Sequence, residues 1–162
     1  AVWSAKNALK GVKSVLIIYG DMPFWKTSTF KKIIKEHQKT GATISLVSVI
    51  LDNPSFFQYG RIIRGNGQLK AIVEEKEATK AQKKIKECNP GCYLIETDWL
   101  WENLPKIKKS SSGEYYLTDL LGLAVSQGKK ITVVQISDWK EAIGINTKEQ
   151  LELAEEILKE KS

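Results

Sequence analysis

The stretch "VLIIYGDMPFW", residues 15–25, decides the fold class. Residues 15–19 are continuously apolar, which predicts a strand buried on both faces. Asp21 follows this strand, and open α/β sheets bind their ligands at the carboxyl ends of the strands. The segment alone leaves two interpretations of Asp21 open, a metal ligand or a turn residue before Pro23.

Further segments alternate between strand and helix along the chain. Asn66-Gly67 lies between two strand-like runs and predicts a β-hairpin over 61–76. Thr79 with Gln82, and Thr147 with Gln150, form capping-box patterns that open helices. The expected strands are 14–19, 42–51, 91–95 and 130–136, and the expected helices are 1–10, 28–39, 79–87, 97–104, 118–127 and 148 to about 161, with a loop over 108–114. This order predicts one α/β domain over 1–162, with a mostly parallel mixed sheet, flanking helices and an inserted hairpin.

The composition is that of an ordinary globular protein. Of the 162 residues, 42% are hydrophobic and 27% are charged. No stretch approaches the roughly 20 apolar residues of a membrane helix, and no signal-peptide pattern opens the chain, so we expect no membrane partner and a cytoplasmic location.

The basic excess does not favour a nucleic-acid partner. The net charge is +6, but only Arg61 and Arg64 are arginines, and the lysines are scattered along predicted helix faces. Base readout usually depends on arginine, and single-strand binding on aromatic residues along a basic groove. A solvated lysine surface is the favoured interpretation.

Zinc and histidine chemistry are disfavoured. Cys88 and Cys92 are four residues apart, and His37 is the only histidine in the chain. In an extended segment that spacing is roughly 13 Å, too far for a disulfide. We expect both cysteines to be reduced and partly buried, and His37 to face solvent on its lysine-rich helix.

Asn146 and Gly60 are two more positions that could contact a ligand. Asn146 directly precedes the terminal helix, and its side-chain oxygen could join Asp21 on a magnesium ion. Its structural alternative is a residue beside the capping box. Gly60 lies between Tyr59 and a strand, where a glycine permits close approach of the backbone amide to a ligand.

Four further candidates carry polar side chains that suit sugar hydroxyls. Glu74 falls in register with Ile72 on the inward side of an alternating strand. Asn89 precedes the strand 91–95, and Tyr116 and Thr118 lie at a helix start. Each has a structural alternative as a capping, turn or core residue.

Six sequence motifs, taken in their order along the chain, resemble those of a known protein family, although no single residue among them is diagnostic. They are "LIIYGDMP", "YGRIIR", "IVEEKEAT", "ECNPGCY", "GEYYLTDL" and "GINTKEQL". In this order they resemble bacterial N-acetylglucosamine-1-phosphate uridyltransferases, over roughly residues 1–155. The resemblance implies an incomplete nucleotide-diphospho-sugar transferase fold, which is Rossmann-like.

The resemblance also implies a reaction and a set of site residues. UTP and a sugar-1-phosphate would form UDP-N-acetylglucosamine and pyrophosphate with Mg²⁺ held by Asp21 and Asn146. Tyr19 and Gly20 would line the nucleotide-sugar. The amide of Gly60 and the side chains of Glu74 and Asn89 would hold the sugar, and Tyr116 and Thr118 would lie near the sugar-phosphate.

Departures from the family's pattern leave alternatives open. The loop "DNPSFFQYG" (52–60) is about two residues longer than the usual D-D-P-T-G-Y-G, so a different sugar or nucleotide is the first alternative. Pro90 stands where the family usually has Ala or Thr.

The family's glycine-rich phosphate loop and its hexapeptide-repeat acetyltransferase domain have no counterpart in the 162 residues. We therefore expect the C-terminal two-thirds of a nucleotidyltransferase domain, inactive alone and completed by an N-terminal segment or by homo-oligomerisation. A non-catalytic binding module is the second alternative.

Overall fold

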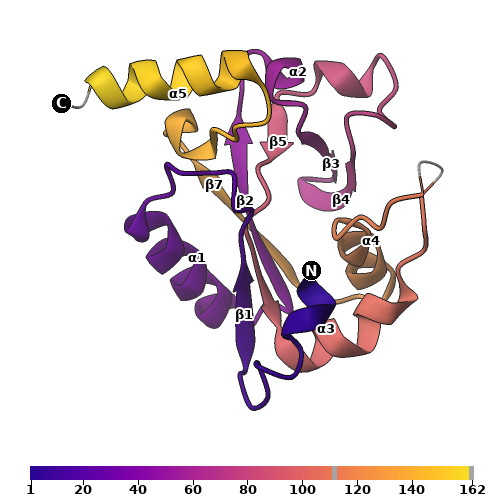
Figure 1. Ribbon diagram of the computed structural model, residues 1–162. Helices are drawn as coiled ribbons and strands as arrows, with labels where there is room; N and C mark the ends of the chain where they lie inside the picture. Colours follow the sequence, from indigo (N-terminus) through magenta and orange to yellow (C-terminus); the bar gives the residue numbers. More distant parts are fainter. Residues whose placement is uncertain (111–112, 161–162) are drawn as a thin grey trace.

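The computed structural model describes residues 1–110 and 113–160. Seven strands form one sheet in the order β1-β6-β2-β5-β3-β4, and β7 pairs with β2. The strands are β1 (Ser14–Ile17), β2 (Ile44–Ile50), β3 (Gly60–Gly65), β4 (Gln68–Val73), β5 (Glu87–Asn89), β6 (Tyr93–Glu96) and β7 (Ile131–Ile136). The α-helices are α1 (Thr27–Thr40), α2 (Pro54–Phe57), α3 (Thr97–Asn103), α4 (Asp119–Ser126) and α5 (Lys148–Glu160). The fold is the expected α/β class, with helices on both faces of the sheet (Figure 1).

The predicted strand direction is wrong. Among the described strands, only β2 and β7 pair in parallel, with Ile44 opposite Ile131. The other strand pairs are antiparallel. β1 and β2 do run the same way, but β6 lies between them and pairs antiparallel with both. The sheet is therefore mixed and mostly antiparallel, because a strand from later in the chain separates two strands joined by a helix.

Two of the predicted helices are shorter than expected. The N-terminal helix is only the 3₁₀ turn η1 (Val2–Ala5), which buries no side chain. The helix predicted from Thr79 is only η2 (Gln82–Lys84). Its capping box does form, since the Thr79 amide donates to Gln82 Oε1 at 2.8 Å and the Gln82 amide to Thr79 Oγ1 at 3.3 Å. A cap without an apolar face to bury does not sustain a longer helix.

Two other 3₁₀ turns, η3 (Leu104–Lys106) and η4 (Trp139–Ala142), complete the described elements. The hairpin prediction is confirmed, because β3 and β4 pair across Asn66 and Gly67. Both turn residues have left-handed φ values, 52° and 77°, as the tightest hairpin turns require. Positions 111–112 of the predicted loop and position 161 of the predicted terminal helix lie outside the described residues.

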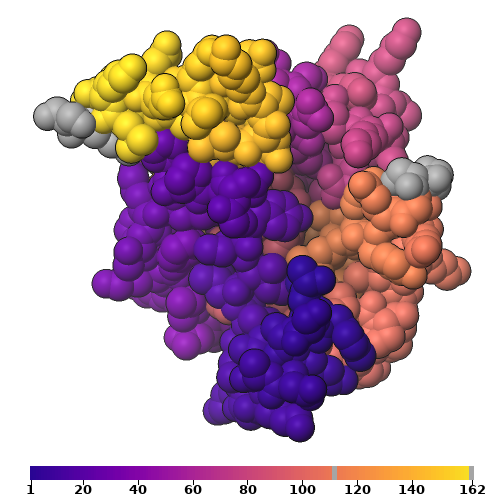
Figure 2. Space-filling view, viewed as in Figure 1, coloured from indigo at the N-terminus to yellow at the C-terminus, as the bar shows by residue number. Residues whose placement is uncertain are grey.

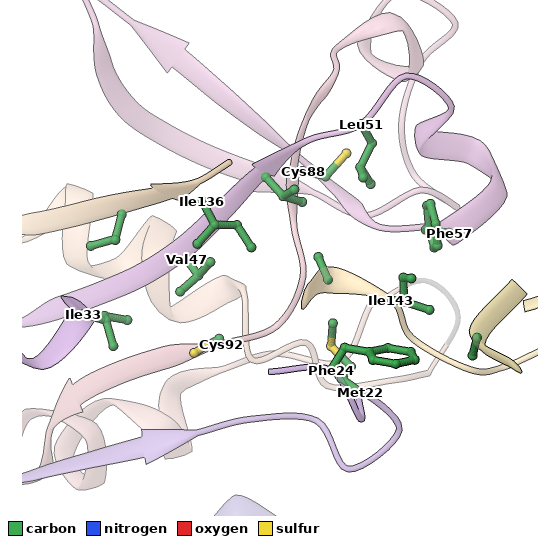
Figure 3. Close-up of a cluster of buried hydrophobic side chains, with 14 of the residues drawn as sticks. Met22, Phe24, Ile33, Val47, Leu51, Phe57, Cys88, Cys92, Ile136 and Ile143 are labelled. Carbon is green, nitrogen blue, oxygen red and sulfur yellow. The ribbon is translucent and has the colours of Figure 1, made fainter. Parts of the chain in front are cut away.

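Alternate residues of β2 enter two apolar clusters on opposite faces of the sheet. Val47 and Val49 join the cluster covered by α1 and α5, shown in Figure 3. Ile44 and Leu46 join the cluster under α3 and α4. In the space-filling view (Figure 2), α5 covers one end of the molecule and the N-terminal residues lie toward the other. None of the described helices has both the length and the apolarity to cross a bilayer.

The two cysteines and the histidine are all buried in the protein interior. Cys88 and Cys92 are free and fully buried in the first cluster, which confirms the reduced state and exceeds the expected burial. The prediction for His37 is wrong: its ring is buried against β2, with Nδ1 2.9 Å from Ser45 Oγ. The lysines beside it occupy the outer face of α1, while His37 shares the inner face with Ile33.

Candidate functional site

A pocket of about 400 Å³ opens where several strands and the start of α5 meet. Its wall contains six of the nine residues predicted from the sequence, which come from five separate segments: Tyr19, Asp21, Gly60, Glu74, Asn89 and Asn146. The polar ends of these segments thus gather at one place, as the resemblance implies.

Asp21 and Asn146 form one end of the pocket. Asn146 Nδ2 donates to Asp21 Oδ2 at 3.0 Å, although the two residues are 125 positions apart. The backbone amide of Ile145 also donates to the carbonyl of Asp21, at 3.0 Å. A Cβ on Gly144 would lie 2.8 Å from the Tyr59 hydroxyl, so only glycine allows this segment to pass.

These two side chains fit a magnesium ion. Mg²⁺ takes hard oxygen ligands, often only one or two from protein, and completes its shell with water and substrate phosphates. The Asp21 carboxylate offers such an oxygen, and turning the Asn146 amide presents its oxygen in place of Nδ2. The described residues contain no cluster of three or more His, Cys, Asp or Glu side chains able to hold a metal.

Glu74 lines the same pocket, next to Gly60. A Cβ on Gly60 would lie 3.3 Å from Glu74 Oε2 and 2.7 Å from Ile72, so glycine leaves room for the carboxylate. Thr118 Oγ1 donates to Glu74 Oε1 at 2.6 Å. Burial raises the pKa of Glu74, and the hydrogen bond from Thr118 opposes that shift. Thr118 therefore lies behind the pocket and acts on it through Glu74.

Asn89 and Tyr19 also line the pocket. Asn89 Nδ2 donates to the Tyr93 hydroxyl at 2.5 Å, and Asn89 Oδ1 accepts from the Gly91 amide at 3.2 Å. A primary amide has a second N–H and a second lone pair, so Asn89 keeps capacity for a ligand. The Tyr19 ring lies on Gly91, where a Cβ would come within 2.3 Å of it.

Besides Thr118, two predicted residues do not line the pocket. Gly20 is exposed and does not line it. Tyr116 also lies outside the pocket wall, and its hydroxyl donates to Glu114 Oε2 at 3.0 Å.

Sequence reasoning missed Gln150 as a site residue. Gln150 is 2% exposed, and its Oε1 accepts from the amides of Asn146 at 2.7 Å and Thr147 at 3.1 Å. Its Nε2 donates to the Phe56 carbonyl at 2.9 Å. The capping-box pattern signals the first role, but only the tertiary structure reveals the link to Phe56.

The loop 52–60 adds an aromatic wall. The Phe57 and Tyr59 rings stack with centroids 5.7 Å apart and planes at 15°. The Tyr59 hydroxyl donates to the Ala142 carbonyl at 2.8 Å, which anchors the loop near the metal end. Burial raises the pKa of Tyr59, so this hydroxyl stays a donor.

Fold and pocket together define an α/β domain whose polar pocket is lined by carboxylate, carboxamide and tyrosine side chains. The sequence profile of the nucleotidyl transferase family matches residues 1–144. The chain belongs to the nucleotidyl transferase family.

Individual relatives agree with this assignment. The chain is 42% identical over 149 residues to the bifunctional protein GlmU of Caldicellulosiruptor saccharolyticus, covering 91% of this chain and 32% of that protein. It is 38% identical over 162 residues to the bifunctional protein GlmU of Fervidobacterium nodosum, covering 99% and 34%. The chain thus spans about one third of the length of these relatives.

A solved structure extends the agreement to the fold. The structure of an apo UDP-glucose pyrophosphorylase superimposes with a TM-score of 0.71 at 17% identity, covering 99% of this chain and 59% of that one. At this identity the likeness concerns the fold alone.

Proposed function

We propose that this chain forms the sugar-binding and metal-binding side of a uridylyltransferase that makes UDP-N-acetylglucosamine and pyrophosphate from UTP and N-acetylglucosamine-1-phosphate. The observation that carries the proposal is the contact between Asp21 and Asn146 in the same pocket that Glu74 and Asn89 line. Family membership and the similarity to GlmU proteins support it.

In the proposed reaction an oxygen of the sugar phosphate attacks the α-phosphorus of UTP, and pyrophosphate leaves. Mg²⁺ bound by Asp21 and Asn146 would neutralise phosphate charge. Glu74 and Asn89 would orient the sugar by accepting from, and donating to, its hydroxyl groups. Such catalysis consists of positioning and charge stabilisation, so it needs no nucleophilic side chain in the pocket.

The test is Asp21→Ala. We expect this variant to keep its fold, because Asp21 is only half-buried. Magnesium-dependent affinity for UDP-N-acetylglucosamine, measured by titration calorimetry, should fall sharply. In the natural protein that carries this sequence, pyrophosphate release should fall about 100-fold or more.

Asp52→Ala is the matched control. Asp52 is an aspartate with a 97% exposed side chain, paired only with Lys86 in the part of the chain that the structure describes. We expect this variant to bind and turn over like the unchanged protein. Unchanged magnesium-dependent binding and turnover in Asp21→Ala would refute the metal site.

A different sugar or nucleotide is the second candidate, favoured by the aromatic loop 52–60 on the pocket wall. A panel of UTP, dTTP and ATP with N-acetylglucosamine-1-phosphate and glucose-1-phosphate separates the two. Preference for any pair other than UTP with N-acetylglucosamine-1-phosphate would replace the first candidate. Binding of none of them would favour a non-catalytic module.

A further inference from the structure

Gln58 occupies a backbone conformation that glycine prefers, directly on the pocket wall. It ends α2 with φ 56° and ψ 29°, in the left-handed region, and its amide donates to the Pro54 carbonyl at 3.1 Å. The family loop that this chain resembles has glycine immediately before the Tyr-Gly pair, where Gln58 stands here. A side chain in this conformation costs free energy that glycine would not.

Gln58 lies on the pocket wall between two aromatic neighbours whose rings stack on each other. Phe57 and Tyr59 stack on each other on either side of it, and Phe57 is buried in the first cluster. Gln58 is exposed and lines the pocket. Within residues 1–110 and 113–160, its carboxamide forms no hydrogen bond, so no group in this part of the chain offsets the backbone cost. Strained residues of this kind concentrate at ligand sites.

The pocket wall also carries the carboxamides of Asn89, Asn146 and Gln150, each of which is hydrogen-bonded to other protein groups. Among the described residues, the carboxamide of Gln58 is the one on this wall that is left wholly for a ligand. Glu74 is an acceptor that suits hydroxyls. A carboxamide presents one acceptor and two donors, which matches the acceptor and donor of an acetamido group. Sites that hydrogen-bond a substrate group discriminate strongly against analogues lacking it.

We propose that Gln58 is a specificity-determining residue whose carboxamide binds the acetamido group of the sugar. The proposal rests on the proposed function and adds to it the residue that separates N-acetylglucosamine from glucose. Gln58 lines the same pocket as Gly60, Glu74 and Asn89, the residues proposed to hold the sugar.

The experiment measures the affinities of UDP, UDP-glucose and UDP-N-acetylglucosamine by titration calorimetry with Mg²⁺. Gln58→Gly should weaken UDP-N-acetylglucosamine about fivefold to tenfold, the effect of one lost hydrogen bond, and leave UDP and UDP-glucose unchanged. Because glycine suits the left-handed backbone, its melting temperature should equal or exceed that of the unchanged protein. Misfolding therefore cannot account for the loss.

Gln58→Asn is the second variant. Asparagine tolerates the left-handed conformation and keeps the amide, but holds it one methylene further from the sugar. We expect the same selective loss. Unchanged affinity for UDP-N-acetylglucosamine in Gln58→Gly, or equal weakening of both sugar nucleotides, would overturn the proposal for Gln58. Absence of UDP and nucleotide-sugar binding by the unchanged protein would instead refute the proposed function, and this proposal with it.

Discussion

At the residue scale, His37 is a titratable side chain that the fold keeps away from water. It lies in the last turn of α1, with its Nδ1 2.9 Å from Ser45 Oγ. Burial lowers the pKa of His37 below its usual 6.5, because the charged imidazolium loses its hydration inside the protein. The folded state therefore favours the neutral ring.

We expect the free energy of unfolding to fall as the pH drops below 6.5. In that range the unfolded histidine takes up a proton that the folded one resists, so acid favours the unfolded state. Above pH 6.5 both states are neutral at this residue and the effect vanishes. Urea unfolding at pH 7.5, 6.5 and 5.5 measures the trend, and His37→Gln should flatten it. Equal pH slopes for the two proteins would contradict the role of His37.

The contacts of single site residues show what a sequence can and cannot predict. Asp21 and Asn146 are predictable, because one follows a buried strand and the other precedes a helix, and motif order joins them. The bond from Thr118 to Glu74 is not, since its partners are 44 positions apart and come from a helix start and a strand end. His37 was wrongly predicted to face solvent because its sequence neighbours are lysines. These lysines occupy the outer face of α1, whereas His37 lies one turn after Ile33 on the face that packs against the sheet.

At the element scale, Gln150 connects the start of α5 to the end of α2. It satisfies the exposed amides at the helix N-terminus, as capping boxes do. Its other end holds the Phe56 carbonyl. The segment carrying Asn146 and the loop carrying Gln58 are therefore fixed to each other through one buried side chain.

Gln150→Leu should destabilise the protein by about 2–3 kcal/mol, since it leaves two amides and one carbonyl without their partner in a partly buried position. The chain supplies a matched control in Gln82→Leu, the same position of the second capping box, on the more exposed turn η2. That change should cost less than about 1 kcal/mol. Urea unfolding measures both, and equal losses would show that Gln150 is only a cap.

Most of the strands were predictable, but β5 was missed and the strand directions were not predictable. Apolar runs and the Asn66-Gly67 turn mark β1, β2, β7 and the hairpin β3–β4 correctly. A continuous apolar run indicates that a strand is covered on both faces, but it does not indicate which strand lies beside it. Only the pairing of β6 with both β1 and β2 makes the sheet mostly antiparallel.

At the scale of the whole molecule, the strand β2 joins the two apolar clusters into one cooperative unit. Val47 and Val49 pack on one face and Ile44 and Leu46 on the other, all at 0–1% exposure. Neither cluster can lose its packing without exposing the other side of the same strand. We therefore expect the protein to unfold in a single transition.

Cys88 and Cys92 report on that transition, because both are fully buried in the first cluster. Burial raises the pKa of Cys88 to about 11 and that of Cys92 to about 12, so the reactive thiolate is scarce in the folded state. Reaction with a disulfide reagent at pH 8 should be slow and should modify both cysteines at one common rate. That rate should rise with urea as global unfolding does, because labelling requires the cluster to open. Ser55→Cys, an exposed position on α2, should react at once and shows that the reagent is active. Rapid modification of either native cysteine alone would mean that β5 or the start of β6 opens separately, and the two faces of the sheet would then not unfold as one.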